Sequence, residues 1–415
     1  MVHNIGGVAR LPKGAWYMRE MCCLAVLTAA GWWLPVAHAV AQSEVRLRVC
    51  DSVTGQPLPQ VSVLQAQGER AWSNGEGSLE VEVTRGDTLR LYCPGYASCT
   101  VVAGEGGGQV ALVPLREARE QPADGPALAA KVLHEVATRM QADMKGHGKA
   151  TSEYYIRQDN EVEGNRHLIE GVLEARNAGC LVRAKMLAGN HYSAEDVDQP
   201  FKYSNLHYTL SLGPVGRWGE LWSNLDLPLM RRRPHRGAFR YETDYWADCR
   251  LLVSDDGSQR LYRITLTHNP RSGSLRFVHG TLLVDAATLL PVSFEGDTEG
   301  LEMRLHSHIG WRNVPMSVHM RIDYTHCEGY LQVQAMSTWC RCEGVDCRTV
   351  VVRNSNGTSS ARAFPNDRAN MLSRQVYVRD HEGDTSLMPL PRTAAQTALV
   401  QEGVKGNKVK TFTRY

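Results

Sequence analysis

The chain has 415 residues, a formal net charge of +2 and 7% aromatic residues. A nearly balanced charge argues against a nucleic-acid-binding protein, because such proteins usually carry a strongly basic patch or stripe. The length is sufficient for two or three domains, even after the leader described next is removed.

Residues 1–41 have the organisation of an export signal. A short charged start at 18–21 precedes the uncharged apolar stretch 22–36, and small residues suited to signal peptidase follow at 37–41. The apolar stretch is shorter than the roughly 20 residues that span a bilayer. We therefore predict a signal peptide cleaved before Gln42, with an uncleaved anchor as the alternative.

Translation starts at either Met1 or Met18, and the sequence leaves this open. No later segment is apolar enough for a membrane span. We expect a periplasmic or cell-surface protein, and peripheral association with the membrane is compatible with its composition.

The cysteines favour disulfides. The chain contains 11 cysteines, of which Cys22 and Cys23 fall in the leader, so an odd number remains and at least one thiol stays unpaired. Several of the others are expected to pair in an oxidising compartment. The C-x-C spacing near residue 340 is poor for zinc, and connectivity does not follow from sequence. The candidate disulfide cysteines are Cys50, Cys93, Cys99, Cys327, Cys340, Cys342 and Cys347.

Residues 42–116 are predicted to form a β-sandwich. Short segments that alternate apolar and polar residues are separated by turn sequences rich in glycine, proline, asparagine and aspartate. This spacing of short strands is typical of a sandwich. The strand segments lie at 45–49, 61–64, 79–83, 89–92 and 110–115, and the turns at 51–59, 74–77 and 86–87.

Four ordered strings in this region carry a family resemblance. They are VCDSVTGQPLPQV from residue 49, NGEGSL from 74, GDTL from 86 and GY at 95. They resemble carboxypeptidase-regulatory-like domains, although Gln60 stands where a small residue is usual and Leu79 where phenylalanine is usual. The resemblance implies a prealbumin-like, seven-strand, non-catalytic module, of the kind that occurs in envelope proteins of Bacteroidota.

Residues 117–125 are predicted to be a linker, and a helix is expected at 126–145. Its apolar residues share one face at helical spacing, as in a helix that packs on a core. Gly146 is expected to end it, and Pro126 suits its first turn. The apolar residues are Leu128, Val132, Leu133, Val136 and Met140.

Residues 126–415 are predicted to form this helix plus a larger antiparallel β-rich domain. The segment 280–292 resembles lipoprotein-carrier-like half-barrels, which implies a curved sheet with an apolar groove beside the helix. The segments YYIR at 154–157 and IEGVLE at 169–174 resemble the second region of the same Bacteroidota proteins. Strands are expected at 152–157, 167–174, 260–267, 280–285, 291–295, 301–306, 316–324 and 331–339.

Residues with catalytic or metal-binding potential are few. His167 and Glu170 match half of a zinc carboxypeptidase site, but side chains three apart in a strand point to opposite faces. His306 and His308 share a strand face, and surface histidines are favoured there over a metal site. The basic segment 231–236 is favoured as a solvated loop over a site for a phosphate-bearing glycolipid.

Together these patterns favour an exported, non-catalytic envelope protein with a binding or scaffolding role, associated with outer-membrane transport or envelope assembly. The expected partner is a cell-envelope protein or an apolar ligand, with no nucleic acid, cofactor or metal. The alternative is a periplasmic, metallopeptidase-like hydrolase whose site is assembled from scattered residues such as His167, Glu170 and Asp244.

Overall fold

The computed structural model describes residues 42–65, 70–84, 86–103, 107–147, 151–162, 164–177, 181–193, 245–271, 277–307, 310–327, 329–354, 390–406 and 409–413. Contacts divide the chain into Met1–Gln42 and Ser43–Tyr415, and nearly all described residues belong to the second unit. The predicted signal peptide, the basic segment 231–236, Asp244 and His308 lie outside the described residues.

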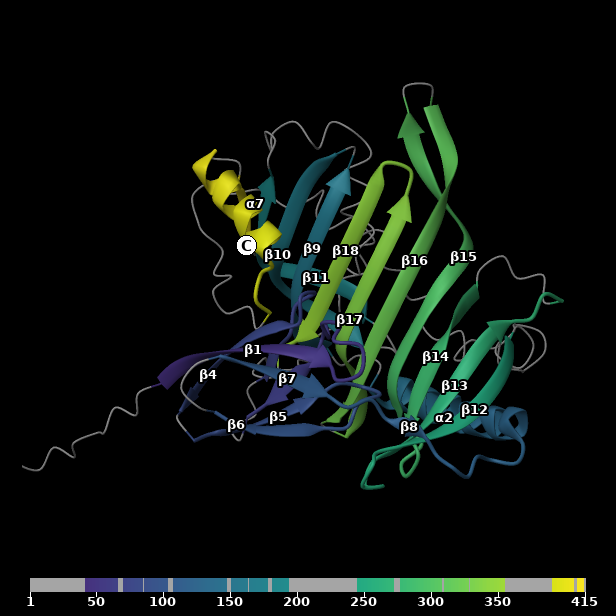
Figure 1. Cartoon of the computed structure of the whole chain (residues 1–415). Coiled ribbons are helices and arrows are strands. Elements are labelled where there is room, and N and C mark those ends of the chain that lie inside the picture. The colour runs from purple at the N-terminus through teal and green to yellow at the C-terminus, as the bar shows by residue number, and fades with distance from the viewer. Residues whose placement is uncertain are drawn as a thin grey trace, which may run out of the picture. The chain divides into compact units, whose positions relative to one another are not determined.

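The first strands form two small sheets over one core (Figure 1). One sheet has the order β4-β1-β7 and contains β1 (Gln42–Asp51), β4 (Ser78–Thr84) and β7 (Gly108–Leu112). The other has the order β3-β2-β5-β6 and contains β2 (Ser62–Leu64), β3 (Arg70–Trp72), β5 (Thr88–Tyr92) and β6 (Cys99–Val102). The predicted β-rich character of this region is confirmed.

Alternation explains why these segments are strands. In β1 the side chains of Val45, Leu47 and Val49 are buried, whereas the charged residues between them are exposed. Successive side chains of a strand point to opposite faces, so this pattern gives one face to the core and one to water. β1 pairs in parallel with β7.

The remaining described strands form one large sheet in which neighbouring strands are antiparallel. Its order is β19-β11-β10-β9-β18-β17-β16-β15-β14-β13-β12-β8. The strands are β8 (Arg116–Glu117), β9 (Thr151–Val162), β10 (Asn165–Asn177), β11 (Leu181–Ser193), β12 (Tyr245–Val253), β13 (Arg260–His268), β14 (Phe277–Asp285), β15 (Pro291–Ser307), β16 (Gly310–Cys327), β17 (Tyr330–Cys342), β18 (Val345–Arg353) and β19 (Val409–Thr413).

Among the long-range pairings of this sheet, that of β9 with β18 positions the candidate site. Strands β12 to β18 follow one another as a meander, and β9 then pairs with β18. The hairpins of β9, β10 and β11 therefore extend the sheet beyond the last strand of the meander. The strands expected at 291–295 and 301–306 are one continuous strand, β15, because a register shift after Thr298 absorbs the interruption.

Two helices lie among the described residues, where one was predicted. The first, α2 (Gly125–His147), runs through Gly146, so this glycine does not end it. Its residues Val132, Leu133, Val136 and Met140 are buried in a cluster with the large sheet, which confirms a packing helix.

The second helix, α7 (Ala394–Lys405), was not predicted, and it packs on β11 and β10. It is short, and only Leu399 and Gly403 are buried, so it carries little helical periodicity. Its clearest sequence signal is the capping box of Thr393 and Gln396, in which each side chain bonds to the backbone N–H of the other residue.

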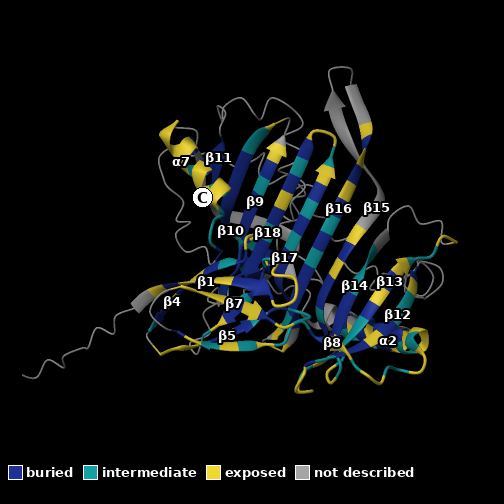
Figure 2. Ribbon diagram, viewed as in Figure 1, coloured by how far each residue is buried: buried dark blue, intermediate teal, exposed yellow. Residues whose placement is uncertain are grey.

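The large sheet has two faces with different partners. We name them the α2 face, where Ile156, Ile169 and Val351 join the cluster of α2, and the α7 face, where Leu168 and Tyr192 pack with Leu399. Figure 2 shows that buried and exposed residues alternate along many of these strands. On the α7 face, Trp72 of β3 also packs with Ala335, Val352 and Leu390.

Candidate functional site

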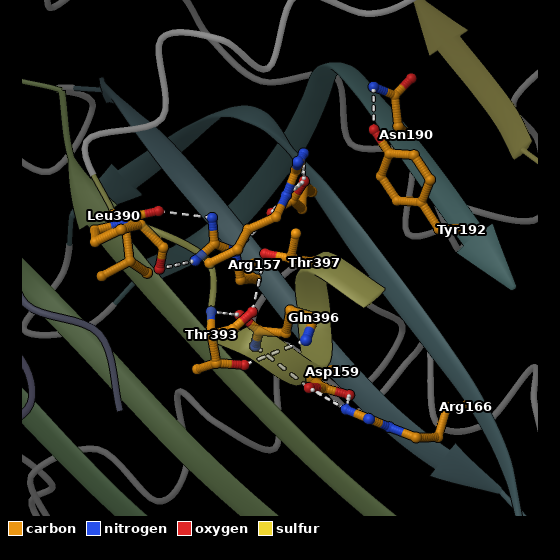
Figure 3. Close-up of polar contacts among 12 residues, drawn as sticks. Arg157, Asp159, Arg166, Asn190, Tyr192, Leu390, Thr393, Gln396 and Thr397 are labelled. Atoms are coloured by element: carbon orange, nitrogen blue, oxygen red, sulfur yellow. Dashed lines mark hydrogen bonds and ion pairs between the residues drawn. The ribbon is translucent and has the colours of Figure 1, made fainter. Parts of the chain in front are cut away.

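A charged cluster on the α7 face was not predicted from sequence (Figure 3). Arg157 of β9 lies opposite Glu170 of β10, and its Nε donates to Glu170 Oε1 at 2.7 Å. Arg392 donates from Nε and Nη2 to the same carboxylate at 3.1, 3.0 and 2.5 Å. Two guanidinium groups thus share one fully buried carboxylate, and we name these three residues the charged anchor.

The charged anchor holds the C-terminal segment against the sheet. The two Nη atoms of Arg157 donate to the carbonyl oxygens of Leu390 at 2.7 Å and Pro391 at 2.8 Å. Further along this segment, Gln396 donates to Asp159 at 3.3 Å. Breaking a buried ion pair leaves a charge without compensation, so this cluster is suited to fixing α7 in place.

The other side of the same strands carries a group of polar residues on the α2 face. We name it the polar patch, and it crosses five adjacent strands from β11 to β17. Asn160 lies opposite both His167 and Cys347, and Thr349 lies opposite both Gln158 and Thr338. Its members are Gln158, Asn160, His167, His191, Thr338, Cys347 and Thr349, each exposed by no more than 3%.

Hydrogen bonds connect several members of the polar patch. The Gln158 amide donates to Asn160 Oδ1 at 3.2 Å and to Cys347 Sγ at 3.3 Å. His167 Nδ1 lies 3.2 Å from His191 Nε2, so one ring donates and the other accepts. Hydrogen bonds thus link β9 to β18 and β10 to β11 within the buried patch.

Two polar atoms of the patch have no hydrogen-bond partner. They are Asn160 Nδ2 and the Thr338 hydroxyl oxygen, both buried. A buried polar group without a partner costs about 1–3 kcal/mol. Such groups are few in native proteins, and each one calls for a physical explanation.

Burial also changes the chemistry of the histidine pair. Desolvation lowers the pKa of His167 to about 4, because the charged imidazolium is disfavoured away from water. At neutral pH this ring is uncharged, so it can accept a hydrogen bond at one nitrogen and donate at the other. The polar patch thus offers neutral donors and acceptors.

The structure separates the predicted pair of His167 and Glu170. His167 contacts His191 on the α2 face, whereas Glu170 is part of the charged anchor on the α7 face. The prediction that the two residues point to opposite faces is confirmed. The third residue of that hypothesis, Asp244, and the side chain of His306 lie outside what the structure describes.

The candidate disulfide cysteines are distributed over both parts of the fold. Cys50 lies in β1 and the partly exposed Cys99 in β6, whereas the buried Cys93 directly follows β5. Cys340, Cys342 and Cys347 lie on the hairpin of β17 and β18. The structure shows no disulfide at these six cysteines or at Cys249, and the side chain of Cys327 is outside the described part.

Sequence reasoning missed most of the polar patch, although one signal was present. In β9 the alternation that buries Tyr154 and Ile156 on the α2 face continues with Gln158 and Asn160. Polar residues at positions that the alternation assigns to the core indicate a buried polar site. The strands that supply His191 and Thr349 were not predicted, so their proximity could not be inferred.

The described residues contain neither a cluster suited to a metal ion nor a helix suited to spanning a membrane. No group of three or more histidine, cysteine, aspartate or glutamate residues in the described ranges is arranged to hold a metal ion. Neither α2 nor α7 is long and apolar enough to cross a membrane.

Comparisons with known proteins do not assign a family. No family model matches the chain, and no curated protein matches it. Among solved structures, a DUF1329 family protein from Desulfovibrio piger is similar at 10% identity and a TM-score of 0.26, over 56% of this chain and 92% of that chain.

A protein of unknown function from Bacteroides fragilis is similar at 10% identity and a TM-score of 0.15, over 75% of this chain and 98% of that chain. The complex of MucA and MucB from Pseudomonas aeruginosa includes a chain similar at 10% identity and a TM-score of 0.16, over 55% and 94% respectively. TM-scores this low do not establish a shared fold, so these likenesses carry no argument.

Proposed function

We propose that the protein is exported and acts as a non-catalytic binding protein of the cell envelope, with the polar patch as its recognition site. The leader at residues 1–41 supports export, because it has the charged, apolar and small-residue parts of a signal peptide. The proposal includes a role in outer-membrane transport or envelope assembly, which the family resemblance implies.

The resemblance itself is part of this proposal. Strands β1 to β7 divide into a three-stranded and a four-stranded sheet with one shared core, which supports a carboxypeptidase-regulatory-like module at residues 42–116. We propose that this module supports the larger sheet. The contact of Trp72 with Ala335 and Val352 supports that role.

The observation that carries the binding function is the pair of unpartnered atoms, Asn160 Nδ2 and Thr338 Oγ1. Departures from full hydrogen bonding are expected at functional sites, where stability is given up for recognition. Asn160 Nδ2 is a donor, so an acceptor oxygen of a bound ligand would satisfy it.

The apolar neighbours of the patch narrow the class of ligand. Ile156, Met336 and Val351 belong to the buried cluster on the same face of the same strands. A ligand that contacts both groups carries hydroxyl or carbonyl oxygens beside an apolar portion. We therefore propose an amphipathic ligand, which refines the apolar ligand expected from sequence.

A direct test is to isolate the mature protein without denaturation, extract it with organic solvent and identify the released molecules by mass spectrometry. We expect the wild type to release an amphipathic molecule. The amount released by Asn160→Leu and by Thr338→Val should be lower by about tenfold or more, because losing a hydrogen bond of about 1.4 kcal/mol weakens binding about tenfold. The matched control is Thr265→Val, which changes an exposed threonine of β13.

Stability gives the second readout of the same variants. Because Thr338→Val removes a buried hydroxyl that has no partner, we expect the free energy of unfolding to rise or stay constant while binding is lost. If Thr338→Val destabilises the protein and the extracted species are unchanged, the polar patch is not the site. A mature protein that stays in the cytosol with its leader intact refutes the export part.

The hydrolase alternative is not favoured by the geometry of the described residues. Glu170 accepts from Arg157 and Arg392, so its carboxylate is committed to the charged anchor. His167 lies on the other face of the sheet, within the polar patch.

A further inference from the structure

The hairpin of β17 and β18 places two cysteines directly opposite each other. Cys340 pairs with Cys347, and the last pair of the ladder is Cys342 with Val345. Only Glu343 and Gly344 remain for the turn, and Gly344 has a φ of 67°. Glycine adopts this positive φ without a steric penalty, and the ladder pairs on either side of the turn define the register.

This register places the two cysteines within disulfide distance. Residues directly opposite in an antiparallel pair have Cα atoms about 4.5 or 5.5 Å apart, depending on the hydrogen-bonding of the pair. Disulfides require Cα separations of about 4.4–6.8 Å, so either kind of pair satisfies the requirement. Directly opposed side chains also project to the same face, and both cysteines belong to the same buried cluster.

The same geometry argues against a disulfide between Cys342 and Cys347. Cys342 lies two residues beyond Cys340, so it is diagonal to Cys347 across the ladder. Diagonal pairs are about 7–8 Å apart, which is beyond the range for a disulfide. Of the two cysteine pairs that cross this ladder, only Cys340 and Cys347 fit.

We propose that Cys340 and Cys347 form a cross-strand disulfide in the mature protein. The proposal rests on export, because an oxidising compartment must supply the electron acceptor. The acceptor is the reactive disulfide of a thiol–disulfide oxidoreductase. One cysteine thiolate attacks it to give a mixed disulfide, and the second thiolate then displaces the enzyme. The two thiols lose two protons and two electrons, and the oxidoreductase leaves as a dithiol.

Burial determines when this reaction takes place. Desolvation raises the pKa of Cys347 to about 12 and raises that of Cys340 well above its usual value. The thiolate is the nucleophile, so the folded, reduced hairpin reacts slowly. Oxidation therefore belongs to the folding of the exported chain, before the hairpin is covered.

The disulfide would also support the polar patch. Cys347 accepts from Gln158, and the two bridged strands carry Thr338 and Thr349. A covalent link between β17 and β18 holds these hydroxyls at a constant spacing. The proposed disulfide would therefore help to keep the proposed ligand site in place.

The test uses the full chain, both isolated from the cell envelope and refolded from denaturant in a mixture of reduced and oxidised glutathione. Remaining thiols are alkylated, and the protein is digested with trypsin. Because trypsin cleaves after Arg341, the bond joins two peptides, and fragmentation of the joined species identifies the linked residues. We expect the link between Cys340 and Cys347, retained in the control Cys342→Ala and lost in Cys340→Ala and Cys347→Ala.

Thermal unfolding provides a measurement that does not depend on whether Cys340→Ala and Cys347→Ala fold. We expect reduction to lower the Tm of the wild type and of Cys342→Ala by about 5 °C, as for the loss of a short closed loop. Complete alkylation of Cys340 and Cys347 in both samples, or a link from Cys340 to Cys342, overturns the proposal. If the link forms on refolding but is missing from the cellular protein, the export part of the proposed function is refuted. The mass of the mature chain in the same cellular sample also tests export, because the exported chain is expected to begin at Gln42.

Discussion

At the scale of single residues, burial controls protonation in the polar patch. The pKa of His167 falls to about 4 because its imidazolium would be desolvated. The unfolded chain takes up a proton near pH 6.5, whereas the folded chain does so only near pH 4. The stability contributed by the neutral ring is therefore present above pH 6.5 and is lost as the pH falls through this window.

We predict that the free energy of unfolding of the wild type decreases between about pH 6.5 and 4 more steeply than that of His167→Gln. Urea unfolding at closely spaced pH values measures both slopes. Parallel slopes in the two proteins would contradict the assignment.

His319 supplies a control of opposite sign. Its Nε2 lies 3.3 Å from Glu295 and its Nδ1 3.0 Å from Asp297, and these carboxylates raise its pKa. Its contribution is complete below pH 6.5 and is lost as the pH rises through the raised pKa. His319→Gln should therefore flatten the dependence of the unfolding free energy on pH above pH 6.5. The decrease below pH 6.5, which we assign to His167, should stay unchanged.

At the scale of elements, turns and anchors determine where strands and helices end. The turn before β4 requires Gly77, which has a φ of 73° and whose added Cβ would lie 2.4 Å from the carbonyl oxygen of Val49. Gly75, two residues earlier, has open space around it and no such φ. Two glycines of one turn therefore have different roles.

We predict that Gly77→Ala costs at least about 2 kcal/mol, from the left-handed backbone and the contact with Val49. Gly75→Ala should change stability by no more than about 0.5 kcal/mol. Chemical denaturation measures the unfolding free energy of both variants. Equal losses in the two would contradict a left-handed backbone at Gly77.

The charged anchor is the element-scale feature that secures α7. We predict that Glu170→Ala costs about 3–5 kcal/mol, because Arg157 is left buried without its partner. The control is Arg166→Ala, which removes a partly exposed pair with Asp159 and should cost less than about 1 kcal/mol. Limited proteolysis should cut the Glu170→Ala variant near residues 390–405 first. If Glu170→Ala and Arg166→Ala are equally stable, the segment is held by other contacts.

At the scale of the whole molecule, one buried tryptophan joins the first strands to the large sheet. Trp72 is 1% exposed and packs with residues from β17, β18 and the segment that precedes α7. A second contact is the hydrogen bond from the Ser337 hydroxyl to Gln60 Oε1 at 3.0 Å. Residues far apart in sequence thus share one core.

We predict that Trp72→Ala costs about 3–5 kcal/mol and separates a single calorimetric unfolding transition into two. Trp246→Ala, which changes a 57% exposed tryptophan on β12, should leave one transition and a similar Tm. A Trp72→Ala protein that unfolds in one unchanged transition would show that the contact does not couple the two parts.

Local pattern determined much of the secondary structure. Alternation identified the first strands, helical spacing identified α2, and the parity of a strand separated His167 from Glu170. These properties depend on neighbours within a few residues. The small helix α7 escaped prediction because its burial comes from contact with the sheet rather than from its own periodicity.

Only the tertiary structure decided which strands are neighbours. The pairing of β9 with β18 joins segments nearly 200 residues apart, and it brings Asn160 beside Cys347. Alternation states which face a side chain occupies but not which strand lies next to it, since many pairings bury the same apolar residues. The polar patch, the charged anchor and the cysteine pair all depend on that choice, and the packing of the whole chain made it.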